Sequence, residues 1–158
     1  MTRQITTVKK EIRILGIDTC NPKCTIGAVV RGGYWLDGII LLSQRSVKDP
    51  LTIAETILGT RYYAEVRSIM THDAANLLDP EVIEKVTRLP VIQVSTSQKP
   101  GNYSRFYGSH GKLWVKTKIP GSTLEKIVAV TWTARPMPEP VRLAHLLSRT
   151  RSIPPKPR

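Results

Sequence analysis

The sequence lacks long hydrophobic runs. No stretch approaches the roughly 20 apolar residues that a membrane-spanning helix needs, and residues 1–10 are polar and basic, without the apolar segment of a signal peptide. We therefore expect a cytoplasmic protein with no membrane partner. The length of 158 residues suits one domain with a single core and leaves no room for a second full domain.

Cysteine is also scarce. The chain contains two cysteines, Cys20 and Cys24, which lie close together in the sequence. Two thiols supply at most half of a zinc site and exclude the disulfide framework of a small secreted protein. The cysteines alone therefore predict neither a metal site nor a disulfide.

Acidic residues are nearly absent from the second half of the chain. Residues 88–158 contain 13 lysines and arginines but only two acids, Glu125 and Glu139, whereas residues 1–87 contain 11 basic and 10 acidic residues. Almost all of the net charge of +12 therefore lies in the second half. This bias favours a polyanion partner, because each phosphate that a base neutralises releases condensed counterions. A solvated basic surface with no such partner is the alternative.

Hydrophobic patterning predicts that the chain opens as a meander of three antiparallel strands. The apolar run at residues 12–18 is typical of a buried strand near the middle of a sheet, and it ends on Asp18. Two further apolar runs, at residues 25–31 and 35–42, are joined by the predicted two-residue turn Gly32-Gly33.

Helices and strands then alternate. Asp-Pro pairs at residues 49–50 and 79–80 predict two helix starts, the first helix ending near Gly59 and the second burying Val82, Ile83 and Val86. Strands are predicted at residues 66–70 and 89–94. This order implies parallel pairing with helices packed on the sheet, an α/β architecture.

The last third is less regular. Residues 95–120 are rich in Gly, Ser, Lys and aromatic residues, with a short strand predicted at 113–115. A capping-box pair, Ser122 and Glu125, predicts one helix, and another begins just after Pro140 and runs to about Arg149. We divide the chain into a basic N-terminal arm (1–11), a domain (12–150) and a basic, proline-rich C-terminal tail (151–158) that is expected to extend stiffly.

Several motifs, in their order along the chain, resemble the archaeal endonuclease dU family, which is related to endonuclease V. The most specific match is the string PEPVRLAHLL at residues 138–147, and weaker matches lie at residues 14–18, 27–32, 35–38, 76–79 and 89–92. The resemblance implies an RNase H-like fold with a mixed sheet and flanking helices. For active relatives it implies metal-dependent cleavage of nucleic acid.

The chain departs from this family at the motifs that carry carboxylates. Thr19 follows Asp18 where relatives have a second acid, and residues 47–52 keep only part of another acidic motif. His72 falls near an expected Asp, and the loop after Asp73 is shortened. These differences favour a decayed active site, so we expect no catalytic residues, no metal and no cofactor.

An enzyme with this fold would instead gather several carboxylates around Mg²⁺ or Mn²⁺. Its metal ligands would include Asp18 and Asp73, and its wider set of candidate catalytic residues is Asp18, Asp49, His72, Asp73 and Asp79. Purely local roles would also account for some of these acids, since Asp18 can cap an amide at a strand end and the Asp-Pro pairs are helix starts. His145 lies on an otherwise apolar helix and is interpreted as a packed or capping residue.

Bases and aromatic rings interleave in the irregular segment. Bases can neutralise phosphates while rings stack on unpaired bases, each stack contributing about 1 to 3 kcal/mol. A tyrosine-rich loop folded over the core is the alternative. The predicted nucleic-acid-binding residues of this segment and of the C-terminal region are Lys99, Tyr103, Arg105, Phe106, Tyr107, Lys112, Trp114, Lys116, Lys118, Arg142, Arg149, Arg151, Lys156 and Arg158.

The leading functional prediction is a non-catalytic RNA-binding protein with a decayed nuclease fold, as a component of a ribosome or another ribonucleoprotein. The alternative is a metal-dependent endonuclease acting on deaminated DNA or on RNA. A third hypothesis is a basic protein-interaction module.

Overall fold

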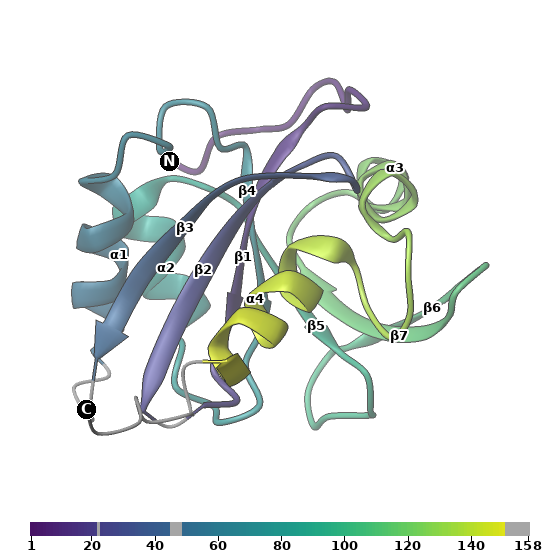
Figure 1. The fold of residues 1–158 in the computed structure, drawn as a ribbon. Coiled ribbons are helices and arrows are strands. Elements are labelled where there is room, and N and C mark those ends of the chain that lie inside the picture. Colours follow the sequence, from purple (N-terminus) through teal and green to yellow (C-terminus); the bar gives the residue numbers. More distant parts are fainter. Residues whose placement is uncertain (22, 45–48, 151–158) are drawn as a thin grey trace.

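The computed structural model describes residues 1–21, 23–44 and 49–150, which form a seven-stranded mixed sheet with helices packed on both faces (Figure 1). The strand order is β3-β2-β1-β4-β5-β7-β6. The strands are β1 (Arg13–Asp18), β2 (Cys24–Arg31), β3 (Trp35–Gln44), β4 (Ser68–His72), β5 (Val91–Ser95), β6 (Ser104–Gly108) and β7 (Gly111–Thr117). The helices are α1 (Pro50–Leu58), α2 (Pro80–Thr87), α3 (Gly121–Thr131) and α4 (Glu139–Thr150).

The predicted antiparallel meander is confirmed. β1 pairs with β2, and β2 pairs with β3, both antiparallel. The turn between β2 and β3 was predicted one residue too short, because Arg31 pairs with Trp35 and leaves Tyr34 in the turn together with the two glycines. Gly32 has a φ of +62°, a conformation that glycine adopts at no steric cost.

The parallel section is confirmed with shifted boundaries. β1 pairs with β4 and β4 pairs with β5, both parallel. Each of these later strands begins two residues after its predicted start, because the apolar runs include Val66 and Leu89, which are buried but lie outside the strands. Asp49 and Asp79 cap α1 and α2 as predicted. On α2, however, Val82 and Val86 are half-buried, and Glu84 and Thr87 are buried beside Ile83.

The prediction was weakest for residues 95–131. Residues 113–115 are the centre of the longer strand β7, and β6 was not predicted because only Phe106 in it is even partly buried. Helix α3 was predicted correctly, but its capping box does not form: Pro120 is the N-cap and no side chain caps the helix.

The sheet separates two apolar cores. On one face, α3 and α4 cover residues such as Ile14, Met70 and Ile92; on the other, α1 and α2 cover Leu15, Ile17 and Ile69. In Figure 1, α4 crosses in front of the central strands. Helix α4 approaches β1 so closely that a Cβ added to Gly16 would lie 2.0 Å from the Pro140 carbonyl oxygen. No helix in the described part of the chain has the length and apolar character to span a bilayer.

Candidate functional site

Four side chains of metal-binding type meet where β1 and β4 end. Asp18 and His72 are neighbours in the parallel pairing of these strands, Cys20 follows β1, and His145 projects from α4. The four residues, called the Asp18 cluster below, place one ligand atom each within 4.8 Å of one another. The close approach of α4 at Gly16 is what brings His145 to the strand ends.

Asp18 is the centre of this cluster and is fully buried. Its Oδ1 accepts a hydrogen bond from His72 Nδ1 at 2.7 Å, and His145 Nδ1 lies 3.3 Å from both carboxylate oxygens. Its Oδ2 accepts from the Cys20 amide at 3.1 Å and from Ser148 Oγ at 3.2 Å. A buried carboxylate needs such donors, because burying an unpaired charge costs several kcal/mol.

The surroundings shift the pKa values of Asp18 and Cys20 in opposite directions. Burial by itself raises the pKa of Asp18, but the hydrogen bond from His72 and the one from the Cys20 amide outweigh it and hold the pKa below its usual range. Burial, reinforced by the charge of Asp18, raises the pKa of the Cys20 thiol to about 12. Asp18 is therefore ionised at neutral pH, and the Cys20 thiol stays protonated unless a cation binds beside it.

The other predicted carboxylates do not join the cluster. Asp73 accepts hydrogen bonds from Thr19 Oγ1 and from the amides of Leu77 and Leu78, at 2.6 to 2.9 Å, so its carboxylate closes a loop. Asp49 and Asp79 accept from amides in the first turns of α1 and α2. The structure thus supports the capping interpretation of these two residues and does not place Asp73 as a ligand beside Asp18.

This donor set is unlike a magnesium site. Mg²⁺ prefers octahedral oxygen coordination, and the Asp18 cluster offers one carboxylate among two imidazoles and a thiol. Imidazole and thiolate ligands suit zinc and related transition metals. The residues could therefore hold a divalent transition metal, and they match poorly the Mg²⁺ expected for an active relative.

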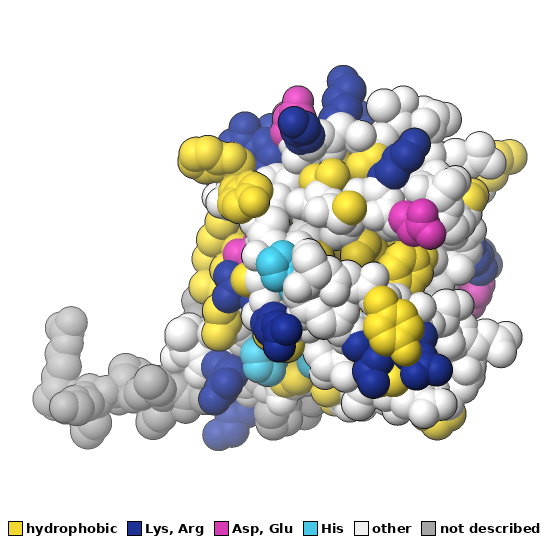
Figure 2. All heavy atoms as spheres, turned by 90° about the vertical axis from the view of Figure 1, so that its right-hand side faces the viewer, with side chains coloured by type: hydrophobic (Ala, Val, Ile, Leu, Met, Phe, Trp, Pro, Cys, Tyr) yellow, Lys and Arg dark blue, Asp and Glu magenta, His cyan; other side chains and the backbone are white. Residues whose placement is uncertain are grey.

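A second feature lies on the β6–β7 hairpin. Arg105 pairs with Trp114 and Tyr107 with Lys112 across the two strands, and Lys116 follows on the same side of β7. These five residues are exposed or half-buried, whereas Leu113 and Val115 on the other side are buried. We call the five residues the basic–aromatic face. In Figure 2, dark blue Lys and Arg side chains adjoin yellow hydrophobic ones, and cyan His side chains are visible in the same view.

Cations on this face already lie over rings. Lys112 Nζ is 4.9 Å from the centre of the Trp114 ring, and the Arg105 guanidinium is 5.7 Å from the centre of the Tyr107 ring. Tyr107 is 71% exposed. The face thus combines positive charge with accessible rings, the two features that contact phosphates and unpaired bases.

One loop connects the two features. Lys99 Nζ donates a hydrogen bond to the Asp73 carbonyl at 2.9 Å, next to the Asp18 cluster. Gly101, two residues later, lies against Lys116, whose Nζ is 3.7 Å from the position of an added Cβ. Lys99, beside the cluster, and Lys116, on the basic–aromatic face, therefore place positive charge at both ends of this loop.

Four other residues predicted to bind nucleic acid make contacts within the protein. Lys118 forms ion pairs with Glu81 and Glu84 at 3.0 and 3.3 Å, and Arg142 forms a two-bond pair with Glu139. Phe106 packs against the core, and the Tyr103 hydroxyl donates to Gln93.

Two predictions concern the C-terminal region. Arg149 is exposed in the last turn of α4, where it can still contact a phosphate. Arg151, Lys156 and Arg158 lie outside the described residues, as does the whole predicted tail.

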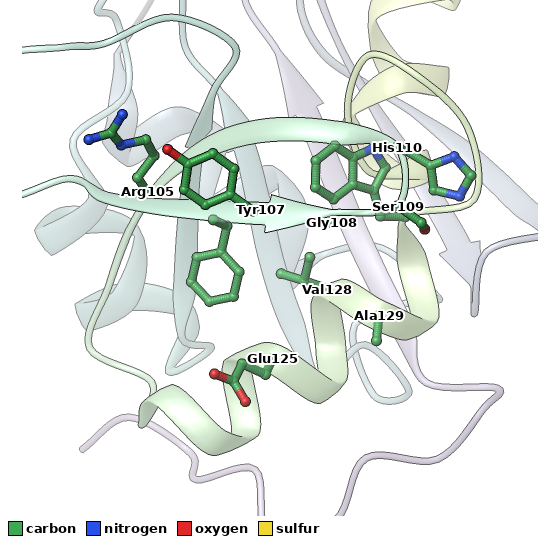
Figure 3. Close-up of a pocket in the computed structure, with 10 residues that line it drawn as sticks. Arg105, Tyr107, Gly108, Ser109, His110, Glu125, Val128 and Ala129 are labelled. Carbon is green, nitrogen blue, oxygen red and sulfur yellow. The ribbon is translucent and has the colours of Figure 1, made fainter.

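The opposite side of the hairpin faces α3 across an open hollow of about 540 Å³ (Figure 3). Glu125, Val128 and Ala129 reach it from α3, and His110 stands at the hairpin turn. Its lining is mixed, because Glu125 and the apolar side chains of α3 face Arg105 on β6. Arg105 and Tyr107 of the basic–aromatic face also line the hollow, so it borders that face at strand β6.

Sequence comparison supplies relatives over most of the chain. A UPF0215 protein of Methanosarcina acetivorans is 32% identical over 89% of this chain and 91% of its own length. Those of Methanosarcina barkeri and Methanothermobacter thermautotrophicus are 30% and 29% identical, again over 89% of this chain. The chain belongs to the UPF0215 family. These relatives of the UPF0215 chain are archaeal. A comparison of the chain with protein-family models finds no match.

Solved structures share the fold of this UPF0215 protein. A protein of unknown function from Archaeoglobus fulgidus superimposes with a TM-score of 0.73 at 21% identity, over 88% of this chain and 97% of its own. Human ENDOV superimposes with a TM-score of 0.61 at 12% identity, over 95% and 91%. The expected endonuclease V-like fold, of the RNase H-like class, is confirmed.

Sequence reasoning missed two members of the cluster. Cys20 was given no role, and His145 was interpreted as a packed or capping residue. The string at 138–147 did contain a signal, because His145 is its one histidine. It lies on α4, the helix that packs closely against β1 at Gly16. Cys20 had no signal in the sequence, because its closeness to His72 depends on the pairing of β1 with β4.

Proposed function

We propose that this UPF0215 protein is a metal-dependent endonuclease that binds nucleic acid along the basic–aromatic face. The observation that carries the proposal is the convergence of Asp18, Cys20, His72 and His145 at the strand ends. The similarity of the fold to human ENDOV supports it. This is the alternative of the sequence analysis, and family and fold support it better than a ribosomal component, for which RNA and ribosome association remain untested predictions.

Different residues of the chain would orient the carboxylate, hold the metal and orient the substrate. Ser148 and the Cys20 amide hold Oδ2 of Asp18, so its Oδ1 is directed at the histidines. A metal held by Asp18, His72 and His145 would polarise a phosphodiester oxygen and lower the pKa of an attacking water. Lys99 and Lys116 lie where they can orient the phosphates of a strand that reaches the cluster from the hairpin.

The test compares two Asp-to-Asn substitutions in a nicking assay with deaminated DNA and structured RNA, each with Mg²⁺, Mn²⁺ or Zn²⁺. Asp18→Asn keeps the side-chain shape and removes the charge at the cluster, so nicking should fall at least about 100-fold, an effect of about 2.7 kcal/mol. Asp79→Asn is the matched control, because Asn also caps helices well and Asp79 lies outside the cluster.

His145→Gln covers the case in which Asp18→Asn unfolds, because His145 is partly exposed and should tolerate replacement. It should reduce nicking without changing the thermal midpoint by more than a few degrees. Nicking that persists in both variants, or wild-type protein that never nicks with any of the cations, contradicts the proposal.

A second candidate is the non-catalytic nucleic-acid-binding protein predicted from the sequence. The observation that favours it is that Asp49, Asp73 and Asp79 are all engaged by local amides, so the carboxylate set of a magnesium nuclease does not assemble in the described residues. Such a protein would retard the same substrates in a gel and leave them whole, and Asp18→Asn would change neither result.

A further inference from the structure

The donor atoms of the Asp18 cluster specify a class of metal. Among them are two imidazole nitrogens and a sulfur, and only one carboxylate contributes oxygen. Hard cations such as Mg²⁺ select oxygen, whereas zinc and its neighbours accept nitrogen and sulfur. Asp18 is fully buried, and its three companions are half-buried, so an ion would be shielded from bulk water but still reachable from solvent.

Two spacings among the ligand atoms match those of a tetrahedral site. With metal–nitrogen and metal–sulfur bonds of about 2.0 and 2.3 Å, tetrahedral ligand atoms lie roughly 3.3 to 3.6 Å apart. Cys20 Sγ lies 3.6 Å from His72 Nδ1, and His145 Nδ1 lies 3.3 Å from Asp18 Oδ1. His72 Nδ1 and Asp18 Oδ1, now 2.7 Å apart in a hydrogen bond, must move apart to share an ion, and all of the ligand atoms lie within 4.8 Å of one another.

An outer shell already orients the carboxylate. The Cys20 amide donates to Oδ2, and Ser148 Oγ lies 3.2 Å from Oδ2 and 2.8 Å from the His145 carbonyl oxygen, so Oδ1 is the oxygen that faces His72; outer contacts of this kind orient metal-binding carboxylates in proteins. We infer that the Asp18 cluster is a four-ligand site for Zn²⁺ or a related transition metal, held by Asp18, Cys20, His72 and His145, and not a Mg²⁺ site. Only the site's role in hydrolysis rests on the proposed function.

The ligand count bears on that role. Four protein ligands fill a tetrahedron, as in structural zinc sites, while catalytic sites keep a position open for water. A substrate oxygen at this site would enter as a fifth ligand or in place of the Cys20 sulfur. Removal of Cys20 therefore separates metal affinity from access to the metal.

The test uses Co²⁺ as a spectroscopic probe on the full-length protein after treatment with a chelator. A cobalt ion bound through Cys20 gives a sulfur-to-metal charge-transfer band in the near ultraviolet and the strong visible bands of tetrahedral coordination. Zn²⁺ should displace the cobalt and abolish both, and a large excess of Mg²⁺ should not. Zn²⁺, but not Mg²⁺, should also raise the thermal midpoint.

Two matched pairs of variants locate the ligands. Cys20→Ser should abolish the charge-transfer band and weaken Zn²⁺ binding by more than about 100-fold, beyond the effect of losing an outer-shell partner, whereas Cys24→Ala should keep the band because Cys24 is outside the cluster. His145→Gln should weaken binding, whereas His110→Gln, on the hairpin, should leave it unchanged.

The possible outcomes separate the two proposals. A wild-type protein without the charge-transfer band, a band that survives Cys20→Ser, or Mg²⁺ that competes equally with Zn²⁺ overturns the zinc inference and leaves a hydrogen-bonded cluster only. Cobalt and zinc binding through Cys20 without nicking overturns the nuclease alone. Mg²⁺-supported nicking that survives Cys20→Ser overturns the zinc site alone.

Discussion

The Asp18 cluster and the basic–aromatic face differ in burial and in the contacts that hold their side chains. The cluster has a fully buried Asp18 and three half-buried partners from the end of β1, from β4 and from α4, and it is held by several hydrogen bonds to the one carboxylate. The basic–aromatic face lies on two strands of one hairpin at the edge of the sheet, exposed or half-buried, with Lys112 over the Trp114 ring and Arg105 over the Tyr107 ring. Substitutions that disturb the buried Asp18 should therefore change geometry and stability together, while those on the face should change binding alone.

Gly16→Ala gives the largest expected effect and should break the cluster without touching the face. The new methyl group would lie 2.0 Å from the Pro140 carbonyl oxygen, so α4 must move away from β1 and carry His145 and Ser148 with it. We expect a loss of roughly 3 kcal/mol in the free energy of unfolding and loss of metal binding, measured by urea denaturation and by cobalt titration.

The matched control is Gly121→Ala, at the first position of α3, where an added Cβ meets nothing within 4 Å. It should be neutral in both measurements. A Gly16→Ala protein that retains full stability would show that α4 does not need its close approach to β1, and the account of how His145 reaches the cluster would be wrong.

Trp114→Ala should do the reverse and weaken the face while sparing the cluster. The ring is half-buried and lies next to Lys112, so its loss removes one stacking platform and costs about 1 to 3 kcal/mol in binding to single-stranded DNA or RNA. Fluorescence anisotropy with a labelled oligonucleotide measures this, and the cobalt spectrum should not change. Unaltered affinity would argue that the strand does not run along this face.

The fold could be predicted because its main elements carry local signals. Asp49 and Asp79 act within their own helices, and the apolar runs of β1 to β5 reflect burial on a central sheet. β6 carried no such signal, since a strand at the edge of the sheet with one partly buried residue lacks apolar alternation. Its place follows from its pairing with β7, a contact between segments rather than a property of either.

The candidate site was harder to predict for the same reason. Asp18 could be proposed because a carboxylate at the end of a buried strand is recognisable in the sequence. Its partners Cys20, His72 and His145 depend on strand register and on the helix that Gly16 admits, and those are properties of packing. The conditional assignment of Asp73 as a ligand found no support, because Thr19 and two loop amides compete successfully for its carboxylate.

Two lysines at the end of β7 test where the basic–aromatic face ends, and the expected effect on binding is smaller. Lys116 lies next to the loop that leads to the cluster, whereas Lys118, two residues further on, is paired with Glu81 and Glu84. Lys116→Gln should reduce the slope of log affinity against log salt by about one, the loss of one phosphate contact. Lys118→Gln should leave the slope unchanged. Equal effects from both would extend the binding surface beyond the five residues assigned to it.

Asp37 lies outside both the Asp18 cluster and the basic–aromatic face, so replacing it should change stability without changing metal or nucleic-acid binding. It lies on the edge strand β3, beside the end of β1 that is remote from Asp18, and accepts hydrogen bonds from Arg13 at 2.8 Å and Arg31 at 3.0 Å. Burial by itself raises the pKa of Asp37, but the hydrogen bond from Arg13 and the charge of Arg31 outweigh it, so its pKa is lowered.

A lowered pKa in the folded state means that the ionised form stabilises the fold. This contribution is complete above the unfolded-state pKa of about 3.9, and it is lost as the pH falls through the lower folded-state pKa. Asp37→Asn should therefore cost about 0.5 kcal/mol at pH 7, since the pairs are partly exposed, and the cost should shrink as the pH falls below the unfolded-state pKa, as read from urea midpoints. Because Asp37 contacts neither region, metal binding and oligonucleotide affinity should stay at their wild-type values, and a change in either would mean that the two regions are coupled through the sheet.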